Sequence, residues 1–170
     1  MANAFMGYDQ YIPLLAPVDI TTVSTSTYID LRNAQHASFL IQFGVITDTT
    51  ATQQIMITIQ CCTAPLGTEA TVEYRYQKSA AVGTGGATQW GDVTSIAATG
   101  VGMHVDADDG FWILATLDLG LLATSDYRYA RLVLTPDDTT VEACLVSVMG
   151  IIEARYKQDD HISATADASA

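Results

Sequence analysis

Residues 127 to 150 read YRYARLVLTPDDTTVEACLVSVMG, and their pattern decides the class of fold. Apolar and polar side chains alternate in YARLVLT and again in VEACLVSVM, with the cluster PDDTT between the two runs. A period of two places alternate side chains on opposite faces of a β-strand, and Pro followed by Asp favours a turn. The stretch therefore predicts a β-hairpin. Its sequence offers no paired nucleophile and base, no set of metal ligands and no phosphate-binding loop.

The same alternation recurs along the chain from residue 20 onward. The segments that share it are 23–31, 38–46, 53–62, 71–78, 111–119 and the shorter 151–156. Turn-forming clusters separate the segments, at 47–52, 64–69, 82–89, 106–110, 122–126 and 136–140. Eight or nine strands with this spacing predict an all-β fold, an antiparallel β-sandwich that is jelly-roll-like, with at most one helical turn near residues 119–125. Side chains predicted to share a face in the first two segments are Val23, Thr25, Thr27, Ile29 and Leu31, and Phe39, Ile41, Phe43 and Val45.

The composition is that of one folded domain with few charges. The chain has 170 residues, of which 49% are hydrophobic and 15% charged, against about 25% charged in ordinary soluble domains. Mean hydropathy is +0.22. Such a chain is long enough for a single core, and its many Thr, Ser and Gln side chains suit extended β-structure and surfaces that pack against neighbours.

The charge balance excludes one class of partner. Nineteen acidic residues against seven basic ones give a net charge of −12. Binding to DNA or RNA depends on Lys and Arg side chains that displace counterions from phosphates, and the sequence has no stripe of them. We therefore expect no binding to nucleic acid, and a preference for more basic partners.

Three cysteines are present, Cys61, Cys62 and Cys144. Neighbours in a strand point to opposite faces, so Cys61 and Cys62 are not expected to bond to each other. The sequence has no CxxC spacing of a zinc site. We expect all three to be small buried hydrophobic residues in a reducing compartment.

The two ends of the chain differ from its middle. Residues 1–19 are rich in aromatic and aliphatic side chains but contain Pro13 and Pro17, which predicts an extended arm that lies either on another subunit or on its own domain. Residues 20–156 are expected to form the sandwich, and residues 157–170 a flexible polar tail. The N-terminus lacks the positive region of a signal peptide, and no run of about 18 apolar residues occurs, so we expect a soluble protein made in the cytoplasm.

The sharpest candidate for a metal site is the sequence DADDG, which begins at Asp106. Asp106, Asp108 and Asp109 resemble the start of a calcium-binding loop, but Leu117 stands where such a loop has its bidentate Glu. An acidic turn between two strands is the preferred interpretation, and neither a metal nor another cofactor is expected. The histidines are scattered and no serine lies in a nucleophile elbow, so we do not expect an enzyme.

Aromatic side chains offer further candidate contacts. Trp90, near a Gly-rich loop, could line a sugar platform, whereas Trp112 lies in an apolar segment that suits a core or an interface. Tyr127 and Tyr129 flank Arg128 ahead of a strand, a composition typical of protein–protein contacts.

Taken in order, several of these segments resemble a known family. They are DITTVSTSTYIDLRNAQHASFLIQFG at 19–44, IMITIQCC at 55–62, TQWGDVTSI at 88–96, WILATLDL at 112–119, and YRYARLVLT with VSVMG inside 127–150. Across residues 20–150 the chain is similar to the small β-sandwich decoration, or cement, proteins of tailed bacteriophage heads.

The resemblance implies a virion protein on the outer surface of an icosahedral capsid, often a homotrimer, that holds neighbouring major capsid proteins together. It implies no catalytic residues. The alternative function is a carbohydrate-binding or adhesion module of a phage fibre or appendage, with Trp90 as its platform. The residues expected at protein interfaces are Phe5, Tyr8, Tyr11, Ile12, Leu14, Leu15, Tyr127, Arg128 and Tyr129.

Overall fold

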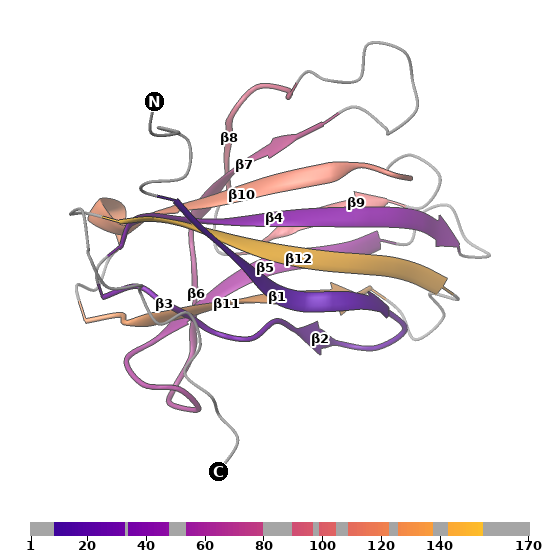
Figure 1. Cartoon of the computed structure of the whole chain (residues 1–170). Helices are drawn as coiled ribbons and strands as arrows, with labels where there is room; N and C mark the ends of the chain where they lie inside the picture. The colour runs from indigo at the N-terminus through magenta and orange to yellow at the C-terminus, as the bar shows by residue number, and fades with distance from the viewer. Residues whose placement is uncertain are drawn as a thin grey trace, which may run out of the picture.

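The computed structural model describes most of the chain between residues 9 and 154. The described residues are 9–32, 34–47, 54–79, 90–96, 99–104, 109–122, 126–137 and 143–154, so the predicted tail at 157–170 lies outside them. They form two antiparallel β-sheets packed face to face, as Figure 1 shows, which confirms the predicted all-β sandwich. Within this part of the chain, no helix is long and apolar enough to cross a membrane.

Two sheets contain all the described strands. The first has, in spatial order, β1 (Asp9–Asp19), β12 (Ala143–Ala154), β4 (Ala34–Thr47), β10 (Trp112–Asp118), β7 (Tyr74–Lys78) and β8 (Thr94–Ile96). The second has β2 (Ser24–Thr25), β11 (Tyr129–Pro136), β5 (Gln54–Cys62) and β6 (Ala70–Val72), with β3 (Ile29–Asp30) beside β11 and β9 (Val101–His104) beside β5.

The order of the strands is that of a jelly roll. β1-β12-β4-β10 face β2-β11-β5-β9, which is the strand order of the two sheets of a jelly roll. β6, β7 and β8 form an insertion between β5 and β9. Of these, β7 and β8 extend the edge of the first sheet, and β6 pairs with β5 in the second. A short 3-10 helix, η1 (Leu119–Leu121), follows β10, where the sequence predicts at most one helical turn.

The core lies between the sheets and is built by the inward-facing half of each strand. Its largest fully buried side chains include Phe39, Phe43, Ile41, Ile55, Ile57, Ile59, Ile113 and Leu117. Tyr74 links the layers, because its hydroxyl donates to the Ile57 carbonyl at 2.6 Å from β7 in the first sheet to β5 in the second. The three cysteines are buried and free, as the sequence predicts.

The predicted hairpin at 127–150 is wrong. β11 lies in the second sheet beside β5, whereas β12 lies in the first sheet between β1 and β4. The two strands therefore belong to opposite layers and do not pair. Alternation correctly identifies both strands and their inward faces, but it contains no information about which strands become neighbours.

The expected boundary between an arm and the sandwich at residue 19 is also wrong. β1 pairs with β12 along its length, and Ile12 and Leu14 are buried in the core. Of the two alternatives for this segment, packing on its own domain is therefore correct from residue 9 onward. Pro13 and Pro17 are tolerated because β1 is an edge strand, where a missing backbone donor costs little.

The predicted common face of 23–31 holds only at its end. Ile29 and Leu31 are buried, but the other three members are exposed. The segment forms two short strands because the Thr27 amide leaves the ladder and donates to the Leu14 carbonyl of β1 at 3.0 Å. Alternation is lost wherever the backbone changes its partner in this way.

Three further predictions differ from the structure in detail. In β4, a register shift opposite β12 turns Val45 outward to 65% exposure, and Ile46 takes the inward place. The described parts of the segments 141–149 and 151–156 belong to one strand, β12 (Ala143–Ala154). The segment 71–78 divides into β6 and β7, which lie in different sheets.

Candidate interaction surface

The outer face of the first sheet carries apolar side chains where a solvated sheet usually has polar ones. Met149 of β12 lies directly opposite Leu40 of β4, which lies opposite Leu114 of β10. Pro13 of β1 lies opposite Met149 and extends the row to the edge of the sheet. Residues that are directly opposite in an antiparallel ladder share a face, so this row of four lies on one side.

A second row runs beside the first. It begins with Tyr11 of β1 opposite Ile151 of β12 and continues with Ser38 and Thr116, whose hydroxyl oxygens lie 2.9 Å apart. Ile151 is half-buried and Tyr11 is 49% exposed. One of the two hydroxyls donates to the other, so part of the hydrogen-bonding capacity of this pair is satisfied within the row.

Together, these rows form the outer apolar band. Its members are Tyr11, Pro13, Leu40, Leu114, Met149 and Ile151. Contiguous apolar surface on the outside of a soluble domain marks a place where another surface is expected to pack. Because the band lies on a sheet whose other face is the core, the packed sheet fixes the backbone positions that carry these side chains.

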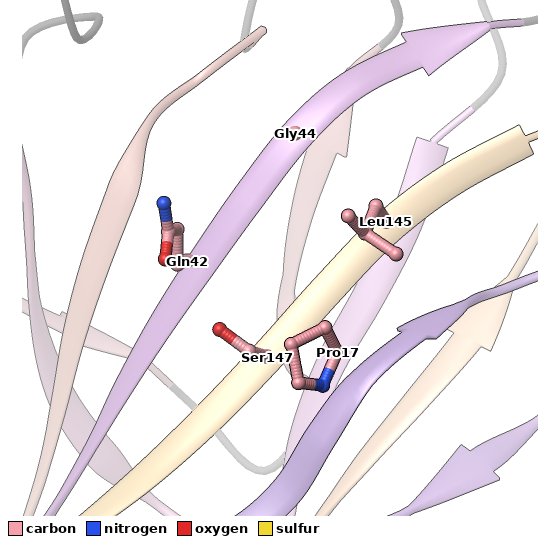
Figure 2. A pocket seen from close by; sticks show the side chains of 5 residues that line it. All are labelled: Pro17, Gln42, Gly44, Leu145 and Ser147. Atoms are coloured by element: carbon pink, nitrogen blue, oxygen red, sulfur yellow. The ribbon is translucent and has the colours of Figure 1, made fainter.

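A shallow hollow lies at one end of the band. Pro17 of β1, Gln42 and Gly44 of β4, and Leu145 and Ser147 of β12 line it, as Figure 2 shows. Its volume is about 100 Å³ and its wall is mainly apolar. Leu145 is 56% exposed and forms part of the rim. The hollow is the right size for one small side chain, and too small for a typical ligand of metabolic size.

Polar residues, two of them acidic, border the opposite end of the band. Glu153, His36 and Asp118 lie directly opposite one another on β12, β4 and β10 and form the next row. An apolar centre with a polar rim is the ordinary anatomy of a protein–protein interface.

Polar side chains gather at a different place, on the outer face of the second sheet. The Glu69 cluster consists of Tyr28, Gln60, Glu69 and Arg131. One carboxylate oxygen of Glu69 accepts a hydrogen bond from the Tyr28 hydroxyl, and the other accepts from the Arg131 guanidinium. Arg131 also donates through Nε and Nη2 to the Gln60 amide oxygen at 3.1 and 3.0 Å, and its guanidinium lies 5.2 Å from the centre of the Tyr28 ring.

The protonation states fit a structural role for this cluster. Burial, together with the hydrogen bond to Glu69, raises the pKa of Tyr28 to about 12, so its hydroxyl remains a donor. Burial and the nearby Glu69 charge also raise the pKa of the Cys62 thiol, which therefore stays protonated and unreactive at neutral pH. The cluster ties the connection between β5 and β6 to the sheet.

The structure separates the residues that the sequence places at interfaces. Tyr11 lies in the outer apolar band, but Ile12 and Leu14 are core residues, which corrects the expectation for these two. Leu15 is partly buried against the core. Phe5 and Tyr8 lie outside the described residues.

The aromatic pair around Arg128 is only partly available for contacts. Tyr127 packs against the core and Tyr129 is half-buried in β11, whereas the Arg128 side chain is exposed. The Arg128 amide donates to the Cys62 carbonyl at 3.0 Å, which places it at the end of β5.

The acidic turn has a structural partner in its described part. Asp106 and Asp108 lie outside the described residues, but the Asp109 carboxylate accepts a hydrogen bond from the Ile46 amide at 2.7 Å. Among the residues that are described, no group of three or more His, Cys, Asp or Glu side chains could hold a metal ion. Trp112 is half-buried on the first sheet, and Trp90 is 40% exposed.

Reasoning from the sequence missed most of the outer apolar band. A signal was present, because SFLIQF, WIL and MGII contain apolar residues in both phases of the alternation. Such runs predict strands with apolar side chains on both faces. The full length of each strand pattern assigns the inward face. The apolar residues that remain belong to the outward face, and they are Leu40, Leu114, Met149 and Ile151.

Comparisons with known proteins add little information about the function of this surface. No family model matches the chain, and no curated protein matches it. The chain is similar to the crystal structure of SPBc2 prophage-derived protein YomS, with a TM-score of 0.42 and 11% sequence identity, over 88% of this chain and 98% of that one. A likeness of this degree carries no argument about activity or partners.

Proposed function

We propose that this chain is a structural virion protein that binds the outer surface of a tailed-phage capsid. As a decoration or cement protein, it contacts neighbouring major capsid proteins and stabilises the contacts between them. It acts as a homotrimer, catalyses no reaction and requires no cofactor, and binds neither nucleic acid nor membrane. It is made in the host cytoplasm and ends on the exterior of the virion.

The outer apolar band is the observation that carries the proposal. Its six side chains lie on neighbouring strands, and leaving such a surface in water forgoes the free energy of its burial. The band lies on a packed sheet, so a partner that covers it does not have to order a loop first. A rigid flat surface of this kind suits contact with another large, rigid assembly.

Charge supports a place on the outside of a capsid. With a net charge of −12, the chain is repelled by packaged DNA and has no counterion release to gain from it. Many identical copies on a repeating lattice also need only a modest affinity at each contact, because one contact raises the local concentration for the next.

The test uses capsids assembled without this protein, to which the purified chain is added. Met149→Asp puts a charge in the middle of the outer apolar band and is expected to weaken binding by about tenfold or more, since it opposes desolvation at the interface. Val23→Asp is the matched control, because Val23 is 60% exposed but lies outside the band. Co-sedimentation with capsids measures binding, and melting temperatures show that both variants fold.

Two results would contradict the proposal. If intact virions contain no copy of the chain, the protein does not lie on the capsid surface. If the Met149→Asp and Val23→Asp variants bind capsids equally well, the outer apolar band does not contact the capsid.

A carbohydrate-binding or adhesion module is the second candidate, because the exposed Trp90 offers a flat ring to a sugar. Glycan binding that is lost in Trp90→Ala, in a protein that does not bind capsids, would favour this function over the first.

A further inference from the structure

A strained turn presents one leucine to solvent at the tip of the connection between β5 and β6. The Gly67 amide donates to the Ala64 carbonyl at 2.9 Å, and Pro65 and Leu66 occupy the two central positions of this turn. Leu66 has φ of +61°, which is characteristic of a type II turn, where glycine or asparagine is the usual residue. Among the described residues other than glycine, Leu66 alone has a positive φ. Its side chain is 74% exposed.

The connection that carries Leu66 projects from the body of the sandwich but is firmly attached to it. Figure 1 shows the magenta connection between β5 and β6 extending below the two sheets. Glu69, three residues after Leu66, is held by Tyr28 and Arg131 of the Glu69 cluster. The backbone therefore holds an apolar side chain outward in a fixed place, at a conformational cost that glycine would avoid.

We propose that Leu66 of one copy inserts into the hollow lined by Pro17, Gln42, Gly44, Leu145 and Ser147 of a second copy. We call the exposed Leu66 side chain the knob. It lies between two strands of the second sheet, whereas the hollow lies on the first, so the contact joins two different surfaces and is heterologous. The inference deepens the homotrimer of the proposed function by naming its contact, but it concerns the protein alone and is tested without capsids.

The sizes of the two parts agree. An apolar cavity of about 150 Å³ holds a benzene molecule. The hollow, at about 100 Å³, admits a group of the size of a leucine side chain. Its mainly apolar wall and the exposed Leu145 on its rim supply the contacts that such a group needs.

An exposed arginine lies beside Leu66, and carboxylates lie beside the hollow. Arg128 is exposed and its amide bonds to the residue that directly precedes the connection, so a positive charge lies near the base of the knob. Asp19 lies directly opposite Leu145 at the hollow, and the Asp109 carboxylate bonds to the Ile46 amide at the same end of β4. The other arginines near this corner pair with carboxylates, Arg131 with Glu69 and Arg32 with Asp30. Arg128 is therefore the charge that this corner brings toward the acidic end of another copy.

The positions of knob and hollow favour a ring or a row of copies. β4 ends near the hollow and β5 begins at that end of the sandwich, so the connection after β5 lies at the far end. A head-to-tail contact between opposite ends closes into a ring when the rotation between copies permits it.

The first experiment compares Leu66→Gly with the wild-type protein by analytical ultracentrifugation. The wild type is expected to associate as its concentration rises. Leu66→Gly removes the knob and relaxes the turn, so it should raise the melting temperature of the monomer while weakening association about ten- to hundredfold. Leu66→Asp should weaken association equally, which separates loss of the knob from any effect of glycine on the loop.

The second experiment locates the contact by mixing a Leu66→Cys variant with a Leu145→Cys variant under mild oxidation. The native cysteines are buried, so the introduced thiols react first. Disulfide-linked pairs are expected in the mixture and not in either variant alone. A wild type that stays monomeric at every soluble concentration, association that persists in Leu66→Gly, or cross-links formed equally by each variant alone would overturn the inference. Capsid binding by a monomer would contradict this contact while leaving the decoration role standing.

Discussion

Glu69 joins side chains from three distant parts of the chain. Its carboxylate accepts from Tyr28, which follows β2, and from Arg131 of β11, while Glu69 itself precedes β6. The side chains of Arg131 and Glu69 are 21% and 20% exposed. Partly buried charges of this kind stabilise a fold chiefly because losing one partner leaves the other without a hydrogen bond.

Glu69→Ala is expected to lower the free energy of unfolding by about 1–3 kcal/mol, because the Tyr28 hydroxyl loses its acceptor and Arg131 keeps only Gln60. Urea unfolding measures the change. Glu73→Ala is the control, since Glu73 is an exposed residue of the same region and should change stability by less than about 0.5 kcal/mol. Equal effects of the two substitutions would show that the Glu69 cluster contributes nothing specific.

At the scale of the elements, the close approach of β1 to β12 fixes the edge of the first sheet. Gly150 of β12 faces Leu14 of β1, and a Cβ atom at Gly150 would lie 2.8 Å from Leu14 Cδ1 and 3.3 Å from Ile29 Cγ2. The glycine therefore makes room for a leucine that fills the core from the edge strand. This fit explains why residues 9–19 belong to the sandwich.

Leu14→Ala is expected to destabilise the protein by about 2–5 kcal/mol, through lost burial and a cavity. Gly150→Ala should cost about 1–3 kcal/mol, because the added methyl collides with Leu14. The double variant should cost less than the sum, since each change relieves the other. Denaturant unfolding of all three tests this, and strict additivity would mean that the two residues do not share one space.

Most elements could be predicted from the alternation, but their partners could not. The inward residues of β5, β10 and β11 follow a period of two, and the structure confirms them as core. The pairing of β12 with both β1 and β4 joins segments separated by about 100 to 140 residues, and no local pattern carries that information. The outer apolar band depends on the same pairings, so its rows emerge only when Met149, Leu40 and Leu114 become neighbours.

At the scale of the whole molecule, the open edges of both sheets are blunted. β2, β3, β6 and β8 are two or three residues long and β9 has four, and the long edge strand β1 contains Pro13 and Pro17. Short strands and prolines prevent another chain from adding to a sheet by backbone hydrogen bonds. Association therefore depends on side-chain surfaces, such as the outer apolar band and the knob at Leu66.

The whole fold is expected to weaken in alkali. Burial raises the pKa of the Cys61 and Cys144 thiols from 9.0 to about 12, and that of Tyr28 rises from 10.0 to about 12. The folded state therefore holds these protons more tightly than the unfolded state, so their contribution is complete below pH 9 and is lost as pH rises toward 12.

Each buried thiol should remove about 1.4 kcal/mol of stability per pH unit above its unfolded pKa. Urea midpoints between about pH 8 and pH 11 measure this slope. Cys144→Ala should make the slope shallower, because it removes one of these groups while Cys61 and Tyr28 still titrate. A midpoint that stays constant across this range would contradict the assignment.

The pairing of Asp9 with Glu153 brings the two described ends of the sandwich side by side. A short peptide that joins residue 154 to residue 9 would close the backbone into a circle with little distortion of the fold. Because closure restricts the denatured chain, a circular form should resist heating better than the linear one. New ends could then be opened at an exposed loop, so that a fused cargo protein would leave the domain from a side of the designer's choice.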